Sequence, residues 1–286
     1  MPTSRPTARG RRPSRLSEPD PGLVARLRAA GCVFAEEEAA LLAAAATGAE
    51  LSALVSRRVA GEPLEHLLGW ASFAGLRVAV GPGVFVPRRR TELLVRLAVS
   101  IADRGNHHGG PVLDDFRGQL SGAVVVDLCC GSGSIGAAVA AACPGVEVYA
   151  ADIDPVAVAC ARRNLPPDRV FEGDLYDALP VDLAGRVDVL AVNAPYVPTD
   201  AIATMPPEAR DHEPHRALDG GADGVTLHRR VADGADRWLA PGGRLLMETG
   251  RAQAVLTVDA CTAAGLAAEV VTDDDLDATA VVARRP

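Results

Sequence analysis

From residue 123 onward, short apolar runs alternate with longer segments that carry apolar residues at helical spacing. Val124–Val126, Val146–Ala151 and Val187–Val192 have the length and the apolar character of buried strands. The segment Ser134–Ala142, between the first two runs, has the length of a helix. Strands that alternate with helices in this way predict an α/β fold with a parallel, doubly wound, Rossmann-like sheet over residues 123–286.

The same alternation continues to the end of the chain. Further strands are expected at Val170–Phe171, Gly243–Met247, Ala267–Val271 and Ala280–Arg284, and further helices at Pro155–Asn164, Leu227–Leu239 and Ala252–Ala264. The order of these elements along the chain leaves the direction of the last strand open, because sequence order does not fix which strands are neighbours.

Residues 21–60 have a helical pattern without strands. Leu23 and Leu27 fall on one face of a first helix. The acidic run Glu36–Glu38 begins a second helix, because negative charge is favourable at a helix N-terminus. A third helix is expected over Ala49–Val59. The pattern therefore predicts a small helical domain before the sheet.

The remaining segments have other patterns. Residues 61–102 are interpreted as a β-hairpin linker followed by a helix that begins at Leu93. Residues 103–122 are rich in Gly, His and Asp and are expected to form an exposed loop. Residues 1–20 are rich in Pro, Ser and Arg and are expected to be a disordered tail, with a phosphate-binding arm as the alternative.

Composition excludes several classes of protein. The net charge is −8, so we expect no direct binding of nucleic acid, and no apolar run reaches the roughly 18 residues that a membrane span requires. The six cysteines include no C-x-x-C pair, which together with the lack of a signal peptide predicts reduced thiols and a cytoplasmic location. His212, Glu213 and His215 loosely suggest metal ligands, but no further ligand cluster completes a site, so no metal is predicted.

A glycine-rich turn follows the first buried strand. Gly131, Gly133 and Gly136 form G-x-G-x-x-G, which permits a tight turn and places unpaired backbone N–H groups at the start of a helix. Asp152 lies 21 residues after Gly131 at the end of the next strand, where a carboxylate can accept both hydroxyls of a ribose. This arrangement indicates a nucleoside cofactor and by itself leaves NAD and S-adenosylmethionine open.

Other residues near the strand ends are candidates for the same pocket. Asp127 can order the turn or meet the amino-acid end of a methionine moiety. Asp174 can accept from an adenine amino group while Leu175 covers the ring, or Asp174 can simply cap a helix. Cys129 and Cys130 lie inside the turn and are interpreted as small residues, not as a redox pair.

The fourth buried strand ends in Asn193, Ala194, Pro195 and Tyr196. Proline ends the strand because it lacks a backbone donor, and ligands bind beyond the carboxyl ends of strands in open α/β sheets. An amide nitrogen is a poor nucleophile, and two acceptors that bind both of its hydrogens would orient it for in-line methyl transfer. The Asn193 side chain and the Ala194 carbonyl can supply those acceptors, and Tyr196 offers a face for a flat substrate. The alternative is a plain strand-ending turn.

Residues 60–250 resemble the HemK-type protein-(glutamine-N5) methyltransferases, which modify the Gly-Gly-Gln glutamine of peptide-chain release factors. Asn193–Tyr196 is similar to the N-P-P-Y tetrapeptide of that family, and Pro87-Arg88 with Thr91-Glu92 is similar to its P-R-x-x-T-E element. Further motifs in the same order are Gly61-Glu62-Pro63, Leu68-Gly69, Phe73–Leu76, Asp127–Gly133, Glu213-Pro214, Ala217–Gly221, Asp223-Gly224, Pro241–Gly243 and Met247–Gly250.

The resemblance implies a class I S-adenosylmethionine-dependent methyltransferase fold, a release factor as the protein substrate, and a substrate-recognition role for the helical domain at 21–60. It places the substrate amide at Asn193, Ala194, Pro195 and Tyr196. It places the cofactor at Asp127, Cys129, Cys130, Gly131, Ser132, Gly133, Asp152, Asp174, Leu175 and Asn193.

The sequence departs from the family pattern in three places. Cys129 stands where the family usually has glycine, and Ala194 stands where it usually has proline. Alanine keeps the backbone carbonyl that the chemistry needs. The helical domain is short and divergent, so of all the properties of the family, the identity of the protein substrate is the one that the resemblance supports least.

Four functions remain to be compared. The first is methylation of a release-factor glutamine. The second is the same chemistry on a ribosomal-protein glutamine or on an exocyclic amine of a nucleic-acid base, which the acidic net charge disfavours. The third is an NAD-dependent oxidoreductase that uses Gly131–Gly136, and the fourth is a non-catalytic binding module with the same fold.

Overall fold

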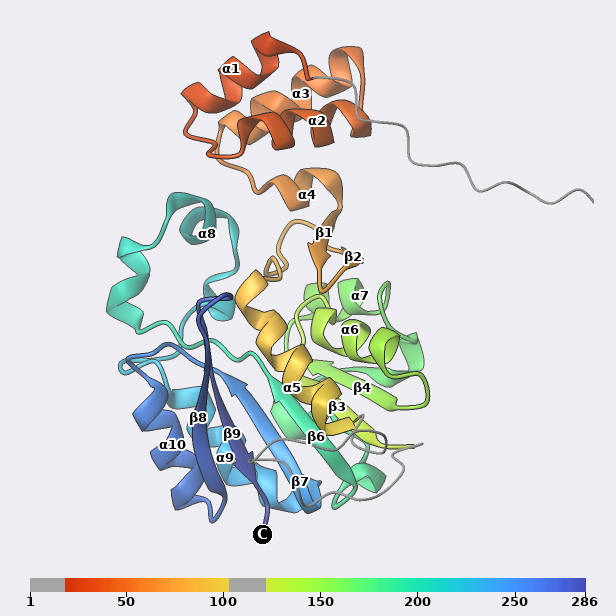
Figure 1. Ribbon diagram of the computed structural model, residues 1–286, viewed down its shortest axis with the longest axis vertical. Helices are drawn as coiled ribbons and strands as arrows, with labels where there is room; N and C mark the ends of the chain where they lie inside the picture. The colour runs from red at the N-terminus through yellow and green to blue at the C-terminus, as the bar shows by residue number, and fades with distance from the viewer. Residues whose placement is uncertain (1–18, 103–121) are drawn as a thin grey trace, which may run out of the picture. The chain divides into compact units, whose positions relative to one another are not determined.

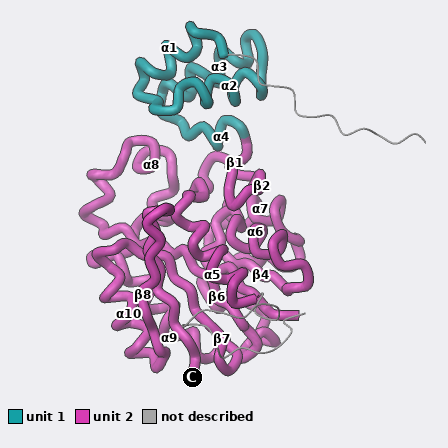
Figure 2. Tube along the Cα trace, viewed as in Figure 1, with its two compact units in different colours: residues 1–68 teal, residues 69–286 magenta. Residues whose placement is uncertain are grey.

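The computed structural model describes residues 19–102 and 122–286, so nearly all of the predicted tail and the predicted loop at 103–122 lie outside the described residues. The chain forms two compact units, residues 1–68 and residues 69–286 (Figure 2). The helical domain was expected to end at residue 60. The boundary falls later because Leu64, Leu67 and Leu68 pack against the core of the first unit.

The first unit contains the helices α1 (Pro21–Ala29), α2 (Ala35–Ala45), α3 (Gly48–Val59) and α4 (Leu64–Leu68). Its small core is built around Leu27 and Leu42, whose side chains are fully buried. Asp20 caps α1 by accepting a hydrogen bond from the Gly22 amide at 2.9 Å. Arg58 and Glu38 form a buried ion pair, with 2.6 Å between Nε and Oε2, that joins α3 to α2.

The second unit begins with an antiparallel hairpin of β1 (Trp70–Phe73) and β2 (Leu76–Ala79). Its turn is made by Ala74 and Gly75, which both have positive φ values. The Glu92 carboxylate, at the first residue of α5 (Glu92–Ala102), accepts a hydrogen bond from the Ala74 amide at 3.1 Å. The turn of the hairpin is therefore tied to the helix that follows it.

The main sheet has the strand order β5-β4-β3-β6-β7-β9-β8. β3, β4, β5, β6 and β7 are parallel, and β9 runs antiparallel to both of its neighbours. The strands are β3 (Val124–Leu128), β4 (Glu147–Asp152), β5 (Val170–Glu172), β6 (Val187–Val192), β7 (Leu239–Glu248), β8 (Ala267–Asp273) and β9 (Ala278–Arg284). The predicted doubly wound α/β fold is confirmed, and the open question about the last strand is answered.

Helices cover both faces of the sheet (Figure 1). α5, α6 (Ser134–Ala142) and α7 (Pro155–Ala161) pack on one face, and α9 (Thr226–Trp238) and α10 (Ala254–Ala263) pack on the other. The short α8 (Pro207–His212) belongs to the long connection that follows β6. Val125 and Val189 face α5 and α6, whereas Val126 and Leu190 face α9 and α10, as expected for successive residues of buried strands.

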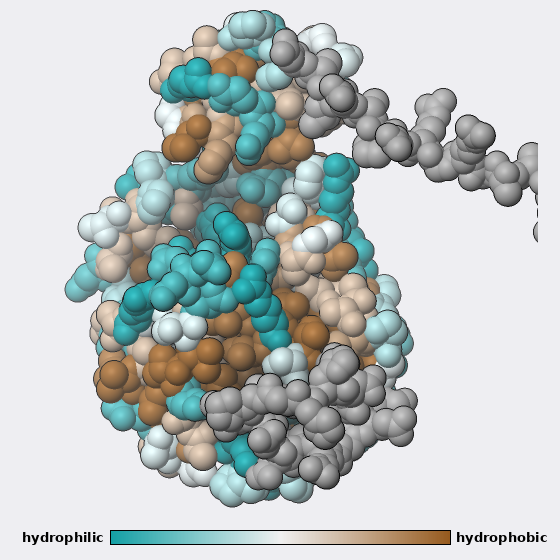
Figure 3. Space-filling view, in the orientation of Figure 1, coloured by the Kyte–Doolittle hydropathy of each residue, from teal (hydrophilic) through white to brown (hydrophobic). Residues whose placement is uncertain are grey.

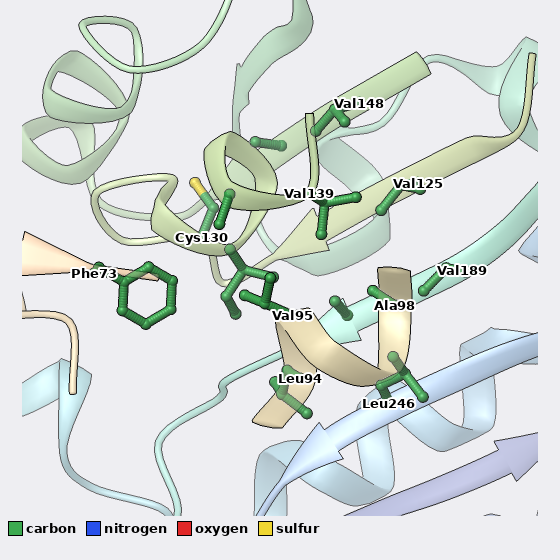
Figure 4. Packing of buried hydrophobic residues seen from close by; sticks show 14 of the residues in the cluster. Phe73, Leu94, Val95, Ala98, Val125, Cys130, Val139, Val148, Val189 and Leu246 are labelled. Atoms are coloured by element: carbon green, nitrogen blue, oxygen red, sulfur yellow. The ribbon is translucent and has the colours of Figure 1, made fainter. Parts of the chain in front are cut away.

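Figure 4 shows the core on the α5 face of the sheet. Leu94 and Ala98 of α5 point toward Val189 of β6 and Leu246 of β7. Leu94, Val189 and Leu246 are completely buried. The helix that follows the hairpin is thus fixed against the two strands in the middle of the sheet, and its first turn lies near their carboxyl ends.

β8 forms an edge of the sheet. Its outward residues include Val270, which is 44% exposed. Figure 3 shows apolar side chains gathered on the face of the second unit that carries β8 and β9. Glu269 and Asp273 place charges along the same strand, which discourages pairing with another chain.

We predict that Leu246→Ala lowers the free energy of unfolding of the second unit by about 2–5 kcal/mol, because it leaves a cavity between α5 and the sheet. Urea titration followed by tryptophan fluorescence measures this unit alone, since Trp70 and Trp238 both belong to it. Val255→Ala on α10, where the side chain is 67% exposed, is the matched control and should shift stability by no more than about 0.5 kcal/mol. Equal losses in the two variants would show that Leu246 is not a core residue.

Candidate active site

A cavity of about 370 Å³ opens at the carboxyl ends of the parallel strands. Its volume falls within the roughly 300–1,000 Å³ that is usual for small-molecule sites. The wall is formed by residues between Gly83 and Thr91, the β3–α6 turn, the β4–α7 turn, Asp174 and Leu175 after β5, Asn193–Val197 after β6, residues between Met205 and Leu218, and Leu227 and Arg230 of α9.

The β3–α6 turn is ordered by two carboxylates. Asp127 accepts a hydrogen bond from the Gly136 amide at 2.9 Å, and Asp152 accepts one from the Gly131 amide at 2.8 Å. Gly133 has a φ of 72° and directly precedes α6. Cys129, Cys130, Gly131 and Ser132 line the cavity, whereas Asp127 and Gly133 are outside the wall and support the turn from behind.

Two buried oxygens of this turn have no hydrogen-bond partner among the described residues, namely Asp127 Oδ1 and Ser132 Oγ. Burial raises the pKa of Asp127 to about 8, and the nearby Asp152 contributes to that shift. Unsatisfied buried acceptors are costly, and they are common where a ligand completes the hydrogen bonding.

Asp152 lies at the end of β4 and in the cavity wall. Its Oδ2 accepts from Gly131 and its Oδ1 accepts from the Asp154 amide at 2.9 Å. Burial raises the pKa of this carboxyl, although the backbone hydrogen bonds oppose the shift. Each carboxylate oxygen can accept more than one hydrogen bond, so both remain available to a ligand in the cavity.

The backbone is strained at two positions in the wall. Cys129 has a φ of 58° and Leu175 has a φ of 50°, and neither residue is glycine. Non-glycine residues in this region cluster at functional sites, where the surrounding structure holds them in place. Burial raises the pKa of the Cys129 and Cys130 thiols, so both stay protonated and are poor nucleophiles.

The adenine-side candidates also lie in the wall. Asp174 forms an ion pair with Arg230 of α9, with 2.8 Å between Oδ2 and Nη2. Asp174 stands at the N-cap position of the short helix Leu175–Ala178, as the alternative interpretation expected, but its side chain makes no capping hydrogen bond. Sequence reasoning missed Ile153, which follows Asp152 and leaves an apolar side chain 56% exposed in the cavity. The signal available in the sequence was the position of Ile153 directly after Asp152.

The tetrapeptide after β6 lies in the wall as one group. Asn193 donates a hydrogen bond from Nδ2 to Thr91 Oγ1 at 3.2 Å, which leaves its carbonyl Oδ1 as an acceptor for a ligand. The Tyr196 hydroxyl donates to Glu248 Oε1 at 2.9 Å. Burial raises the pKa of Tyr196, and the Glu248 charge adds to the shift, so the phenol stays neutral. Ala194 is buried.

Glycines of the connection after β6 support the tetrapeptide backbone. A Cβ at Gly220 would lie 2.8 Å from the Pro195 carbonyl oxygen, and a Cβ at Gly224 would lie 2.5 Å from the Tyr196 carbonyl oxygen. No L side chain fits at such distances. The motif Asp219–Gly224 therefore has a packing role, because it allows two stretches of backbone to lie against each other.

The segment before α5 is fixed to the connection after β6. Arg88 forms an ion pair with Glu213, with 2.6 Å between Nη2 and Oε1, and the same oxygen accepts from the Val86 amide at 3.2 Å. A second ion pair ties the same connection to the β4–α7 turn, with 3.6 Å between Arg216 Nε and Asp154 Oδ2. Sequence reasoning attached no role to Arg216, and it singled out Glu213 only as part of a motif and a loose metal pattern.

Within residues 19–102 and 122–286, no cluster of His, Cys, Asp and Glu side chains is arranged to hold a metal ion. Among the helices of the same residues, none has the length and the hydropathy that a membrane crossing requires.

Comparison with known proteins gives consistent results. Residues 112–206 match the family model described as "Methyltransferase small domain". The release factor glutamine methyltransferase of Bifidobacterium longum is 34% identical to the chain, over 85% of this chain and 90% of the relative. That of Streptomyces coelicolor is 40% identical over 68% of this chain, and the chain spans about 65% of the length of this relative.

A relative with a different printed activity is also similar. The 4-amino-L-phenylalanine/4-methylamino-L-phenylalanine methyltransferase of Streptomyces pristinaespiralis is 36% identical, over 70% of this chain and 65% of the relative.

We predict that Cys129→Gly raises the free energy of unfolding by roughly 0.5–1 kcal/mol, because glycine removes the cost of a positive φ at a smaller entropic cost. Cys130→Gly is the matched control, since the Cys130 side chain lies in the core and the φ of Cys130 is not positive. Cys130→Gly should destabilise the protein in the same urea titration. A loss of stability in Cys129→Gly would contradict the strain assigned to that residue.

Proposed function

Because this chain belongs to the release factor glutamine methyltransferase family, we propose that it transfers a methyl group from S-adenosylmethionine to the side-chain nitrogen of a protein glutamine. The orientation of Asn193 carries the proposal. The Asn193 Nδ2 group donates to Thr91, so the Asn193 carbonyl oxygen is left as an acceptor for a ligand in the cavity. An acceptor at that position suits a substrate that offers N–H groups.

The residues present fit S-adenosylmethionine. Asp152 can bind the ribose hydroxyls, and Ile153 and Leu175 offer apolar surface for an adenine ring. Ser132 lines the cavity, and its buried Oγ has unused hydrogen-bonding capacity on the side where the methionine moiety would lie, whereas Asp127 supports this turn from behind. When bound, this cofactor supplies an electrophilic methyl group on a sulfonium. Burial raises the pKa of Asp127 and Asp152, and a positively charged ligand nearby would oppose that shift by stabilising their ionised forms.

The substrate amide would be held at both of its hydrogens. Asn193 Oδ1 would accept one and the Ala194 carbonyl would accept the other, while the Tyr196 ring would lie against the flat amide. Two such acceptors hold the nitrogen lone pair toward the methyl group and stabilise the positive charge that develops on the nitrogen. The positively charged nitrogen is strongly acidic after methylation and would lose its proton to water, so the mechanism assigns no general base.

The preferred substrate is the Gly-Gly-Gln glutamine of a release factor, with the helical unit as its recognition part. The printed activity of the S. pristinaespiralis relative favours one other candidate, the amino group of a free aromatic amino acid. A ribosomal-protein glutamine is a third substrate with the same chemistry. The net charge of −8 disfavours a nucleic-acid base, because phosphate binding requires many basic contacts.

Transfer of labelled methyl groups to a purified release factor tests the proposal. Label should appear on the glutamine of the Gly-Gly-Gln motif and should disappear when that glutamine is replaced. Parallel reactions contain a ribosomal-protein fraction and 4-amino-L-phenylalanine. Titration with NAD is the control for the oxidoreductase reading. Tight NAD binding without methyl transfer would overturn the proposal.

We predict that Asn193→Ala lowers methyl transfer by at least about 100-fold while the affinity for S-adenosylmethionine changes by less than about 3-fold, because the variant loses an acceptor that acts on the substrate nitrogen. Calorimetric titration of the cofactor is the internal control. Methylation at the wild-type rate would show that Asn193 does not hold the amide.

We predict that Asp152→Ala weakens binding of S-adenosylmethionine by roughly 1–3 kcal/mol, the usual cost of leaving polar partners unpaired. Asp152→Asn keeps one acceptor and should lose less. Comparing the two variants separates ribose binding from the hydrogen bond to Gly131. An unchanged dissociation constant in Asp152→Ala would contradict the ribose assignment.

A further inference from the structure

A buried polar network lies behind the tetrapeptide. Its centre is Glu248, the last residue of β7, which is 4% exposed and lies outside the cavity wall. The Tyr196 hydroxyl donates to Glu248 Oε1 at 2.9 Å, and the Thr91 hydroxyl lies close enough to the same carboxyl to lower its pKa. Thr91 in turn accepts from Asn193 Nδ2 at 3.2 Å. A single carboxyl group therefore contacts Tyr196 directly and Asn193 through one hydroxyl.

The directions of these hydrogen bonds follow from the chemistry of the groups. An ionised carboxylate can only accept, so the hydroxyls that face it must both donate. Thr91 uses its single hydrogen on Glu248, and its oxygen can then only accept from Asn193. Only the NH₂ end of the Asn193 amide can face such an oxygen. The carbonyl end is thereby left for the cavity.

Burial raises the pKa of Glu248, and three neighbours oppose that shift in favour of the ionised form. These neighbours are the hydroxyls of Thr91 and Tyr196 and the charge of Arg90. Arg90 also lowers the pKa of Tyr196, so its positive charge acts on both partners of the hydrogen bond between Tyr196 and Glu248. Glu248 Oε2 is buried without a hydrogen-bond partner among the described residues. An acid retained at such a cost suggests a role beyond stability.

We propose that Glu248 is a positioning residue, which acts through Thr91 to set which end of the Asn193 amide faces the substrate and acts through its hydrogen bond to hold the Tyr196 ring. The inference rests on the proposed function, because it assigns the Asn193 carbonyl to the substrate amide. Glu248 touches neither substrate nor cofactor in this account. Its effect on the reaction is indirect and requires both hydroxyls.

Glu248→Gln tests the role with a side chain of the same shape. The glutamine NH₂ group can donate to Thr91, which frees the Thr91 hydrogen to bind the Asn193 carbonyl and lets the Asn193 amide turn round. We expect kcat to fall by about 10-fold to 100-fold, with KM and the cofactor dissociation constant within about 3-fold of the wild type. Wild-type kcat in this variant would overturn the proposal.

Thr91 provides a second line of test that does not depend on the folding of Glu248→Gln. Thr91→Ser keeps the hydroxyl and should retain activity, whereas Thr91→Val removes it and should lose as much kcat as Glu248→Gln. The kcat of the double variant of Glu248→Gln and Thr91→Val should be no lower than that of the less active single variant, because both changes break one pathway. Losses that multiply would show that the two residues act independently.

Asp188→Asn is the matched control. Asp188 lies at the opposite end of β6, is partly buried, and accepts a hydrogen bond from the Val124 amide at 2.8 Å. This variant should change stability and leave kcat unchanged. A fall in kcat equal to that of Glu248→Gln would reduce the role of Glu248 to general stability.

The failure of this inference can be told apart from failure of the proposed function. If the wild type transfers methyl to none of the substrates, the proposed function fails and kinetics cannot be used. Urea unfolding of the wild type, the Glu248→Gln and Thr91→Val variants and their double variant then tests the network itself. Non-additive losses of stability support the coupling, and additive losses overturn it.

Discussion

The structure depends on the position of β6. This strand is buried on both faces and is paired with β3 on one side and β7 on the other. Its register and direction are therefore determined by contacts along its whole length, and Asn193 is the first residue beyond it. A residue at such a point is placed with little freedom, which is what a site needs when geometry does most of the chemical work.

The carboxyl edge of the sheet collects buried acids. Asp127 near the end of β3, Asp152 at the end of β4 and Glu248 at the end of β7 all have raised pKa values caused mainly by burial. Buried carboxylates reduce stability unless a cation or hydrogen-bond donors compensate them. Strain at Cys129 and Leu175 adds to this cost. The same edge thus combines backbone strain with buried acids, and a positively charged ligand would compensate those acids.

Local patterns in the sequence were sufficient for most elements. The helix Ser134–Ala142 and the strand Val187–Val192 have the predicted bounds, because continuous apolar runs and the glycine turn mark their ends. The sequence also predicted that Asp152, Asp174, Leu175 and the tetrapeptide line the cavity, since all of them lie at or just beyond the carboxyl ends of parallel strands.

Contacts between distant parts of the chain could not be read in this way. Thr91 and Asn193 are 102 positions apart, and Tyr196 and Glu248 are 52 positions apart. The first pair meets because α5 packs on β6 and β7, and the second pair meets because β6 and β7 are neighbouring parallel strands. The support given by Glu248 therefore had no signal in the sequence beyond the motif that contains it. The placement of Asp127 and Gly133 behind the wall, and not in it, likewise follows from tertiary packing.

The order of the strands also affects how the second unit can fold. β9 is the last strand along the chain, yet it lies between β7 and β8. β8 is made earlier and has no place on the sheet until β9 has paired with β7. The hairpin of β8 and β9 can therefore join the sheet only through β9, and until it does, β7 presents an unpaired edge to its surroundings during synthesis.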